Sequence, residues 1–425
     1  MQWTAIARKM VTTGAWADAL KQLSGDGSVY IAGCCGEPTA CLDALDADPD
    51  IAAGRMFTGV WIPGVNTRDV TRQGGRSACV SFVTPALQDA VAELRAQILP
   101  MHYSATSRWL RNSAGLSGAV FQVGPPRDGT VGLGVSADFT PAAIAAGVPL
   151  FAQINPAMPD VVNGPRVPVE RFAAMIEAES PLIEHDAGPL DEAYETLGRH
   201  VARLVRDGDT VQFGLGKLQN AVLGALADHQ DLSLNGGMIS PAFLARLQAG
   251  TIKRAITGVA LGDRDFYDQV SRDPRITFAP VSDTHDGKNL AGIASFVSVN
   301  SILEVDLFGQ GNGEFIAGKQ ITGHGGLVDF IRGAAQSDGG RSILALPATM
   351  RGGSQSRIVP CLSAGIPVTV TRSDVDWIVT EFGGAHLRHA TVDQRADRLI
   401  AIAAPQFRDA LANAWDAARC RETTR

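Results

Sequence analysis

Two glycine-rich turns carry the groups best suited to hold an anion. In the first, Gly214 and Gly216 follow the apolar run at residues 210–213 and precede a stretch of helical composition. At such a position, free backbone N–H groups and the positive end of the helix dipole face an incoming oxyanion. The alternative is a tight strand-to-helix turn that needs glycine only for its backbone angles. The third glycine and the acidic residue of a dinucleotide-binding motif are missing, which argues against a nicotinamide site.

The second turn is denser in glycine. Gly323, His324, Gly325 and Gly326 end a polar, glycine-rich loop and precede an apolar helix start. Glycine lets the backbone approach a bulky ligand, and the N–H groups of such a loop can cradle a phosphate or an oxyanion without a positive surface. We interpret His324, which has glycine neighbours, as a ligand-contacting or solvent-facing residue rather than as a general base.

A third candidate segment is basic. Arg351 and Arg357 place two guanidinium groups at the ends of the flexible stretch RGGSQSR. Because a guanidinium group binds phosphate oxygens in a fixed fork geometry, this segment suits a phosphate-bearing ligand. A solvated loop is the alternative.

The elements that must position these turns alternate along the chain. The 46 glycines and 22 prolines separate short β-branched runs from Ala/Leu-rich helical stretches, which is the pattern of parallel sheets flanked by helices. The sequence therefore predicts the α/β class. Strands are expected at residues 28–32, 119–123, 150–154, 210–213, 255–260, 302–307, 342–346, 368–371 and 377–380, and helices at residues 38–45, 85–95, 169–178, 191–206, 218–227 and 396–402.

An internal repeat indicates two similar lobes. Residues 30–45 and 211–226 share five of sixteen positions, and each segment reads as a strand, a glycine turn and a helix. Residues 180–194 form a plausible linker because Pro, Gly and Asp cluster there. We expect domains at residues 1–188 and 189–425. The alternative is that any two strand–turn–helix units look alike over so short a stretch.

Composition excludes several classes of protein. The 425 residues are 45% hydrophobic with a net charge of −7 and no Lys/Arg block, so no footprint for nucleic acid or an anionic membrane is visible. No uncharged apolar run approaches the roughly 18 residues of a membrane span, and the amino-terminal residues do not read as a secretory signal. A cytoplasmic location is the default. The scattered histidines do not predict a bound metal, and the cysteines are expected to be reduced: Cys34, Cys35, Cys41, Cys79, Cys361 and Cys420.

Longer motifs carry a family resemblance. The chain resembles the acetyl-CoA hydrolase/transferase family, the class I coenzyme A transferases that include 4-hydroxybutyrate and succinyl-CoA:acetate CoA-transferases. The matching stretches are GEP at residues 36–38, QVGPPRDGTVGLGVSADF at 122–139, FGLGKLQNAV at 213–222, NSILEVDLFGQ at 300–310, GHGGLVDFIRGA at 323–334, SRIVP at 356–360, VTEFG at 379–383 and RADRLIAIAAPQFRDAL at 395–411.

The resemblance implies a fold and an activity. It implies two tandem α/β lobes of the CoA-transferase fold, with acyl-CoA at their cleft and its pantetheine and nucleotide largely against the second lobe. Coenzyme A or an acyl-CoA is then a substrate, a carboxylate is the acceptor, and no tightly bound cofactor is implied. A homodimer is what the resemblance suggests.

The family nucleophile is missing from the matching position. Members use a glutamate that attacks the thioester and passes through an acyl-glutamyl anhydride to a glutamyl-CoA thioester. The corresponding stretch here reads LNGGMIS, with Gly237 where the glutamate belongs, and no Asp or Glu occurs between Asp231 and Asp263. CoA transfer by the family route is thus in doubt.

Other residues of the family site persist. The resemblance assigns Asn300, Glu381 and the two glycine loops to the surroundings of the reacting centre. Together with the chemistry of the turns and the basic segment, we expect Gly214 and Gly216 to contact the oxyanion or substrate, and CoA to bind at a further set: Gly323, Gly325, Gly326, Arg351 and Arg357. Gln219 and Ala404 depart from the family pattern and are expected to alter local packing more than the type of reaction. Structural roles are expected for three further acids, Glu37, Glu304 and Glu314.

Three functions remain open. The first is CoA transfer between a short acyl-CoA and a carboxylate without the usual glutamate. The second is thioester hydrolysis, in which Glu381 activates a water and N–H groups of the glycine loops stabilise the oxyanion. The third is non-catalytic binding of acyl-CoA.

Overall fold

The computed structural model describes residues 9–21, 23 and 27–423 and divides the chain into two compact units. Unit 1 comprises residues 1–186, 237–244 and 255–286, and unit 2 comprises residues 187–236, 245–254 and 287–425. The first change of unit falls beside residue 188, but later stretches return to unit 1. The two-domain division at residue 188 therefore stays a prediction. Three continuous elements cross from one unit into the other: β11 (Leu232–Ile239), α9 (Pro241–Gln248) and β12 (Ile252–Ala260).

Unit 1 is built on a seven-stranded sheet with the order β4-β3-β2-β1-β5-β7-β9, in which each pair of neighbours is parallel. The first strand lies in the middle, so the chain steps outward to one side and then returns to the other. The bounds are β1 (Ser28–Ile31), β2 (Met56–Gly59), β3 (Ser77–Val80), β4 (Ala96–Ile98), β5 (Leu116–Val123), β7 (Leu150–Ile154) and β9 (Phe172–Glu177), with a hairpin of β6 (Thr130–Gly132) and β8 (Arg166–Pro168).

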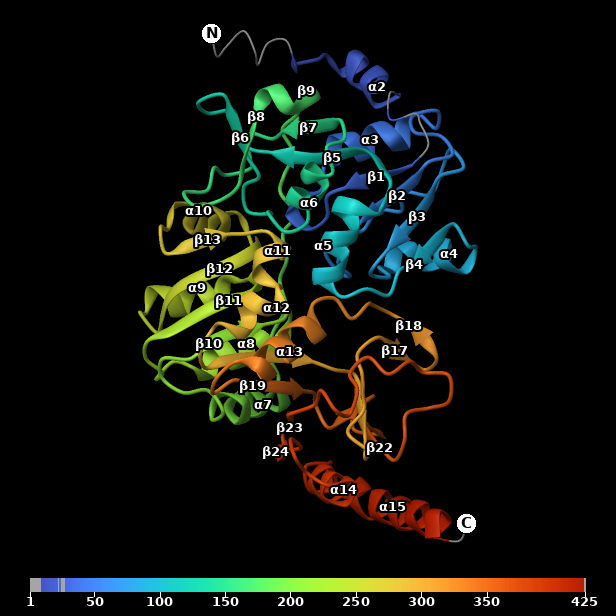
Figure 1. The fold of residues 1–425 in the computed structure, drawn as a ribbon, viewed down its shortest axis with the longest axis vertical. Helices are drawn as coiled ribbons and strands as arrows, with labels where there is room; N and C mark the ends of the chain where they lie inside the picture. Colours follow the sequence, from blue (N-terminus) through green and yellow to red (C-terminus); the bar gives the residue numbers. More distant parts are fainter. Residues whose placement is uncertain (1–8, 22, 24–26, 424–425) are drawn as a thin grey trace. The chain divides into compact units, whose positions relative to one another are not determined.

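Helices accompany these strands (Figure 1). They are α2 (Thr13–Lys21), α3 (Thr39–Ala47), α4 (Gln88–Ala92), α5 (Tyr103–Asn112), α6 (Thr140–Ala145), α10 (Arg264–Arg272) and α11 (Val281–Thr284), with short 3-10 turns η1 (Cys34–Gly36), η2 (Pro85–Leu87) and η3 (Val169–Arg171). The parallel pair of β12 with β13 (Ile276–Phe278) also belongs to unit 1 from Ala255 onward. A core that includes the fully buried Trp16, Phe57 and Phe151 holds the helices on the sheet.

Unit 2 repeats this strand order. From the first part of β11 the sheet runs β11-β10-β14-β19-β23-β24, so its first strand, β10, again lies between its successor and a later strand. The bounds are β10 (Thr210–Phe213), β14 (Phe296–Ser301), β19 (Arg341–Ala345), β23 (Trp377–Thr380) and the antiparallel edge strand β24 (Gly383–His386). This order agrees with the repeat read from residues 30–45 and 211–226.

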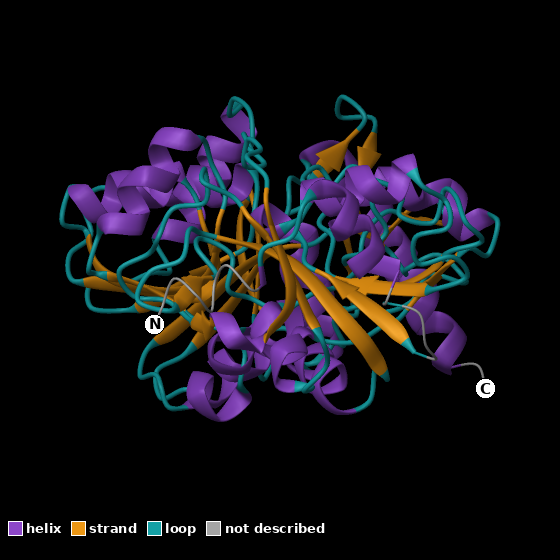
Figure 2. Ribbon diagram, turned by 90° about the horizontal axis from the view of Figure 1, so that it is seen from above, coloured by secondary structure: helices purple, strands orange, loops and turns teal. Residues whose placement is uncertain are grey.

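Helices lie on both sides of the strands, as Figure 2 shows. Those of unit 2 are α7 (Glu192–Ala202), α8 (Lys217–Ala225), α12 (Gly287–Ala291), α13 (Leu327–Gln336), α14 (Val392–Ala401) and α15 (Arg408–Thr423), with η4 (Pro405–Phe407). Small strands carry the loops of this unit: β15 (Glu304–Asp306), β16 (Gly311–Asn312), β17 (Phe315–Ile316), β18 (Lys319–Gln320), β20 (Thr349–Met350), β21 (Gln355–Ser356) and β22 (Ile358–Val359).

The α/β class with parallel-rich sheets flanked by helices is confirmed, and two of the expected elements are wrong. Residues 169–178 were expected to be helical, but η3 and strand β9 occupy them, because Phe172 to Glu177 pair with β7. Pairing and burial override the helical preference of an Ala/Met/Glu-rich stretch. Residues 368–371 form no strand, and only Val370 makes an isolated bridge, to Gly311.

Two smaller expectations concern thiols and membranes. The described cysteines are free thiols, and burial raises the pKa of the Cys41 thiol to about 12. The side chain of Cys420 lies outside the described residues, as do residues 1–8 of the amino terminus. Within residues 9–21, 23 and 27–423, no helix combines the length and apolar character that crossing a membrane requires.

Candidate active site

The first part of the site is the point in unit 2 where the strand order reverses. β10 and β14 are parallel neighbours, with Phe213 opposite Val299. Gly214 follows β10 directly, and Asn300 lies at the carboxyl end of β14. A methyl group placed on Gly214 would lie 3.7 Å from the Oδ1 atom of Asn300. Because ligands of open α/β sheets bind beyond the carboxyl ends of the strands at such a reversal, the structure brings two predicted site residues to the expected edge.

Asn300 is held by a neighbouring amide. Its Nδ2 donates to Oε1 of Gln212 at 2.9 Å, and Nε2 of Gln212 donates back to Oδ1 of Asn300 at 3.3 Å. Both side chains are buried. The reciprocal pair fixes the amide plane of Asn300, and Gln212 is a partner that the sequence analysis missed.

The Gly214–Leu215–Gly216 turn opens helix α8. Gly216 caps the helix with φ of 98°, a backbone angle that favours glycine. At N3 of this helix, Gln219 is 2% exposed, and neither of its side-chain polar atoms has a hydrogen-bond partner among the described residues. A buried amide without a partner costs about 1–3 kcal/mol, so Gln219 is suited to meet a polar ligand atom or a water.

Tyr194 of α7 marks a charged cluster in unit 2. Burial raises the pKa of Tyr194, the nearby charge of Arg357 lowers it, and that of Glu381 raises it. The Nζ atom of Lys217, the first residue of α8, lies 6.0 Å from the centre of the Tyr194 ring. The start of α8, Arg357 and Glu381 thus gather around one tyrosine, which the sequence analysis did not single out.

Glu381 follows strand β23 and is half-buried. Its Oε2 accepts the backbone N–H of Ala348 at 2.8 Å. This hydrogen bond fixes the position of the carboxylate. The geometry suits a group that orients a polar reactant.

The two predicted arginines occupy different surroundings. Arg351 is exposed, has φ of 51°, and lines a cavity of about 510 Å³. Arg357 donates to the carbonyl oxygen of Leu303 at 3.4 Å and belongs to the surroundings of Tyr194 rather than to the cavity wall. The cavity is also lined by Glu304, Phe315, Met350, Ser354 and Phe407.

The second glycine turn leads into helix α13. Gly325 has φ of 54°, and Gly326 caps the helix. The carbonyl oxygen of His324 accepts the N–H of Leu327 at 3.2 Å, which closes the turn. As expected from the sequence, the turn lies at a helix amino terminus, where backbone N–H groups lack intrahelical partners.

Gly237 lies within β11 and belongs to unit 1. A Cβ atom at this position would lie 3.2 Å from Cε1 and 3.5 Å from Nε2 of His285. His285 is 2% exposed, burial lowers its pKa to about 3, and its ring packs 5.3 Å from that of Tyr103. A neutral imidazole therefore borders the place where a side chain at position 237 would begin.

One carboxyl group lies close to this position in space although it is far away in sequence. A Cβ atom on Gly258 would lie 3.1 Å from the carbonyl oxygen of Gly237 and 3.4 Å from Cβ of Asp138. Asp138 is 8% exposed, and burial raises its pKa to about 6. Its only sequence signal is its place in the stretch at residues 122–139.

Glu37, expected to be structural, is also a buried acid of unit 1. Burial raises its pKa to about 7, and Nδ2 of Asn66 donates to its Oε2 at 2.7 Å. Asn66 also binds the backbone of Cys34 and Ile62. These contacts tie the turn at residues 33–37 together. Across the described part of the chain, no three His, Cys, Asp or Glu side chains gather as metal ligands.

Comparison with known proteins gives consistent results. The acetyl-CoA hydrolase/transferase C-terminal domain matches residues 262–415. The chain is 32% identical to the 4-hydroxybutyrate coenzyme A transferase of Clostridium kluyveri over 97% of this chain and 99% of that protein. It is 33% identical to the succinyl-CoA:cyclohexane-1-carboxylate CoA transferase of Geobacter metallireducens, over 78% of each.

Solved structures are similar over nearly the whole chain. RipA from Yersinia pestis has a TM-score of 0.91 at 27% identity and covers 99% of both chains. The 4-hydroxybutyrate CoA-transferase from Porphyromonas gingivalis has a TM-score of 0.80 at 28% identity, covering 99% of this chain and 100% of that one. The chain belongs to the acetyl-CoA hydrolase/transferase family of CoA-thioester enzymes, because the similarity to the Clostridium kluyveri transferase covers nearly its whole length and the structural neighbours have the CoA-transferase fold.

Proposed function

We propose that this protein cleaves short acyl-CoA thioesters by hydrolysis, without a glutamyl-CoA intermediate. The observation that carries the proposal is Gly237: this position supplies no carboxylate, and the ring of His285 lies 3.2 Å from where its side chain would begin. With no nucleophile at this position, water is the simplest nucleophile for the thioester. A homodimer and a cytoplasmic location are part of the proposal on the family resemblance alone.

CoA binding is proposed for unit 2. The cavity lined by Arg351, Phe315 and Met350 offers apolar walls and a guanidinium group at its edge, which suits a phosphate-bearing nucleotide. The turn of Gly323, Gly325 and Gly326 would lie along the pantetheine. Arg357 would contribute charge from its place beside Tyr194.

The reaction needs a held water and a stabilised oxyanion. The water oxygen bonds to the thioester carbon, the carbonyl electrons move to oxygen, and the C–S bond then breaks to release CoA and the free acid. Glu381, fixed by Ala348, would hold the water. N–H groups at the starts of α8 and α13 would stabilise the oxyanion, a contribution worth about 3–4 kcal/mol per donor in other enzymes.

A second candidate function is CoA transfer through another carboxylate. Asp138 supports this function, because Gly258 lies between this buried acid and the backbone of Gly237, close to both. Its pKa of about 6 leaves most of the group ionised at neutral pH and therefore nucleophilic. The names of the relatives at 32% and 33% identity are also those of transferases.

One experiment separates the candidates. The full chain is incubated with a panel of short acyl-CoAs, with and without acetate, succinate or butyrate, while free thiol and new thioester are measured separately and the protein is mapped by mass spectrometry. Hydrolysis predicts thiol release that is independent of added carboxylate and no covalent adduct. New thioester with an adduct on Asp138 that is absent from Asp138→Asn would favour transfer. Binding without either product would leave a non-catalytic acyl-CoA-binding protein.

A further inference from the structure

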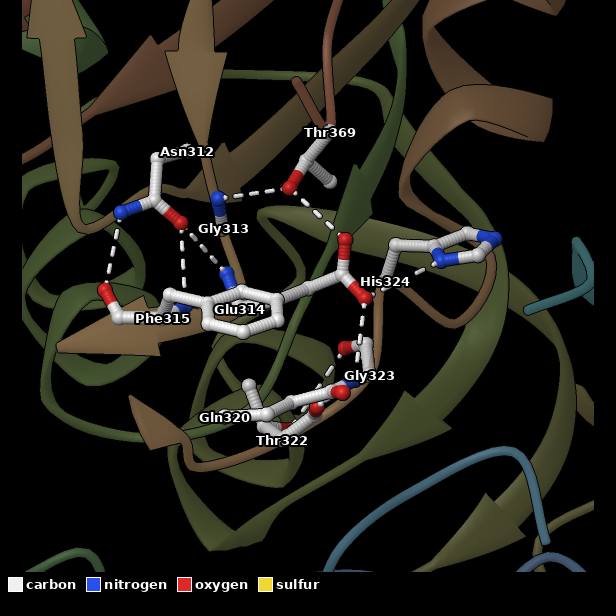
Figure 3. A network of polar contacts seen from close by, with 9 residues as sticks. All are labelled: Asn312, Gly313, Glu314, Phe315, Gln320, Thr322, Gly323, His324 and Thr369. Carbon is white, nitrogen blue, oxygen red and sulfur yellow. Dashed lines mark hydrogen bonds and ion pairs between the residues drawn. The ribbon is translucent and has the colours of Figure 1, made fainter. Parts of the chain in front are cut away.

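Glu314 of unit 2 is a buried carboxylate surrounded by hydrogen-bond donors (Figure 3). It is 7% exposed. The hydroxyl of Thr369 donates to Oε2 at 2.8 Å, and Nε2 of Gln320 donates to Oε1 at 3.4 Å. The ring nitrogen Nδ1 of His324 lies 3.5 Å from the same oxygen, Oε1.

The direction of these hydrogen bonds shows which groups donate to Glu314. Thr369 accepts the N–H of Gly313 at 2.9 Å, so its own proton points to Glu314. An amide nitrogen such as Nε2 of Gln320 can only donate. Both oxygens of Glu314 therefore accept a hydrogen bond, as the oxygens of a carboxylate do. Nδ1 of His324 is placed to donate to Oε1, and in the tautomer that carries its proton on Nδ1 the lone pair is at Nε2.

The backbone holds Glu314 in this place. Oδ1 of Asn312 accepts the N–H groups of both Glu314 and Phe315, at 3.0 and 2.9 Å. Nδ2 of Asn312 donates to Glu304 at 3.1 Å. Glu304 and Phe315 both line the cavity that contains Arg351. Glu314 is thus the chain neighbour of Phe315, a residue of the wall of the cavity proposed for CoA, and Asn312 links its backbone to Glu304 in the same wall.

His324 extends this arrangement to the glycine turn. Its side chain is 12% exposed, and it lies between Gly323 and Gly325, next to the amino terminus of α13. Figure 3 shows Nε2 on the side of the ring that faces away from Glu314. A carboxylate that orients one imidazole nitrogen while the other handles a proton is the arrangement used in hydrolytic enzymes.

The sequence favoured a ligand-contacting or solvent-facing role for His324 and a structural role for Glu314. From the contact between them we propose instead that His324 transfers the proton in thioester hydrolysis and that Glu314 is its positioning residue. This inference rests on the proposed function. Nε2 accepts a proton from the attacking water as the water oxygen bonds to the thioester carbon. After the C–S bond breaks, the same proton passes from Nε2 to the CoA thiolate, so the ring returns to its starting form. Glu381 keeps the separate task of orienting the water.

The test uses the full-length protein and chemical rescue. His324→Ala is expected to lower kcat for acyl-CoA hydrolysis about 10²- to 10⁴-fold, the range for loss of a general base, while KM and CoA binding by calorimetry change less than about threefold. Free imidazole, added at millimolar concentrations, should restore part of kcat. The matched control is His229→Ala, which also loses one ring hydrogen bond, to the carbonyl oxygen of Val205, and should keep wild-type kcat.

Glu314 is tested through its coupling to His324. Glu314→Gln should lower kcat about tenfold in the wild-type background and have no further effect in His324→Ala, because a positioning residue acts only through the group that it positions. If the role of Glu314 were only structural, Glu314→Gln would lower kcat by the same factor in the wild-type and His324→Ala backgrounds. If His324→Ala unfolds at a much lower temperature than the wild type, His324→Gln replaces it in the same coupling measurement.

The outcomes separate this inference from the function on which it rests. A wild-type protein that hydrolyses acyl-CoA while folded His324→Ala does so equally fast overturns the inference and leaves hydrolysis standing. Loss of kcat without imidazole rescue, or with equal Glu314→Gln effects in both backgrounds, also overturns it. A wild-type protein that releases no thiol from any acyl-CoA overturns both.

Discussion

Gly237→Glu introduces a carboxylate at the position where the family resemblance expects the nucleophile, and the structure predicts what opposes it. Gly237 is in strand β11 and is not among the described glycines with positive φ, so backbone strain is not the obstacle. The new Cβ atom would lie 3.2 Å from Cε1 and 3.5 Å from Nε2 of His285. His285 is itself held by Thr284, at 2.8 Å from its Nδ1, and by the ring of Tyr103.

The expected cost comes from overpacking. Forcing extra atoms into a well-packed site costs about 1–3 kcal/mol, so we expect Gly237→Glu to lower the free energy of unfolding by that amount. His285→Ala alone also destabilises, because it leaves a cavity. In the double variant the two effects should be less than additive by about 1 kcal/mol or more, since the ring that the new side chain meets is gone.

The assay has a stability arm and a chemical arm. Urea unfolding of the wild type, both single variants and the double variant gives the coupling energy, with Gly224→Ala as a control at a site where a Cβ meets nothing within 4 Å. Mass spectrometry after incubation with acyl-CoA should detect a covalent adduct at position 237 in the double variant only. Strict additivity, or an adduct in Gly237→Glu with His285 intact, would refute the reasoning that the imidazole occupies the space.

Three further predictions concern ligand binding and pH. Gly325→Leu should abolish CoA binding measured by calorimetry in a folded protein, because φ of 54° disfavours a side chain and the loop would no longer admit the ligand; unchanged affinity would remove this loop from the site. Arg351→Ala should weaken CoA binding about tenfold, because one charge-assisted contact is lost, and should make the binding less dependent on salt. Replacement of the exposed Lys253 by Ala is the control and should leave CoA affinity unchanged. Equal losses of affinity in the two variants would argue against CoA binding in this cavity. Burial raises the pKa of Asp138 to about 6, so the folded state holds this proton more tightly than the unfolded chain, and the free energy of unfolding should fall by about 3 kcal/mol as pH rises from about 4 to about 6. Asp138→Asn should flatten that part of the pH–stability curve, and a curve with the wild-type slope would show that another group is responsible.

Local sequence patterns were sufficient for most of the fold. The expected strands at residues 150–154, 210–213 and 377–380 coincide with β7, β10 and β23, because short apolar runs between turn residues carry their own signal. The two glycine turns were found for the same reason, since each is a local pattern at a helix start. Residues 169–178 were assigned wrongly because the stretch prefers a helix in isolation and becomes a strand only through pairing with β7.

By itself, the sequence determined the α/β class, the repeated strand–turn–helix unit, the glycine turns and the absence of a carboxylate at position 237. The tertiary structure alone decided which side chains meet. His285 borders Gly237 across 48 residues of sequence, and Thr369 orients Glu314 across 55 residues. No local periodicity encodes such contacts, because they depend on the register of strands and the packing of loops that lie far apart in the chain. The burial that raises the pKa of Asp138 and lowers that of His285 arises in the same way, from the fold rather than from neighbouring residues.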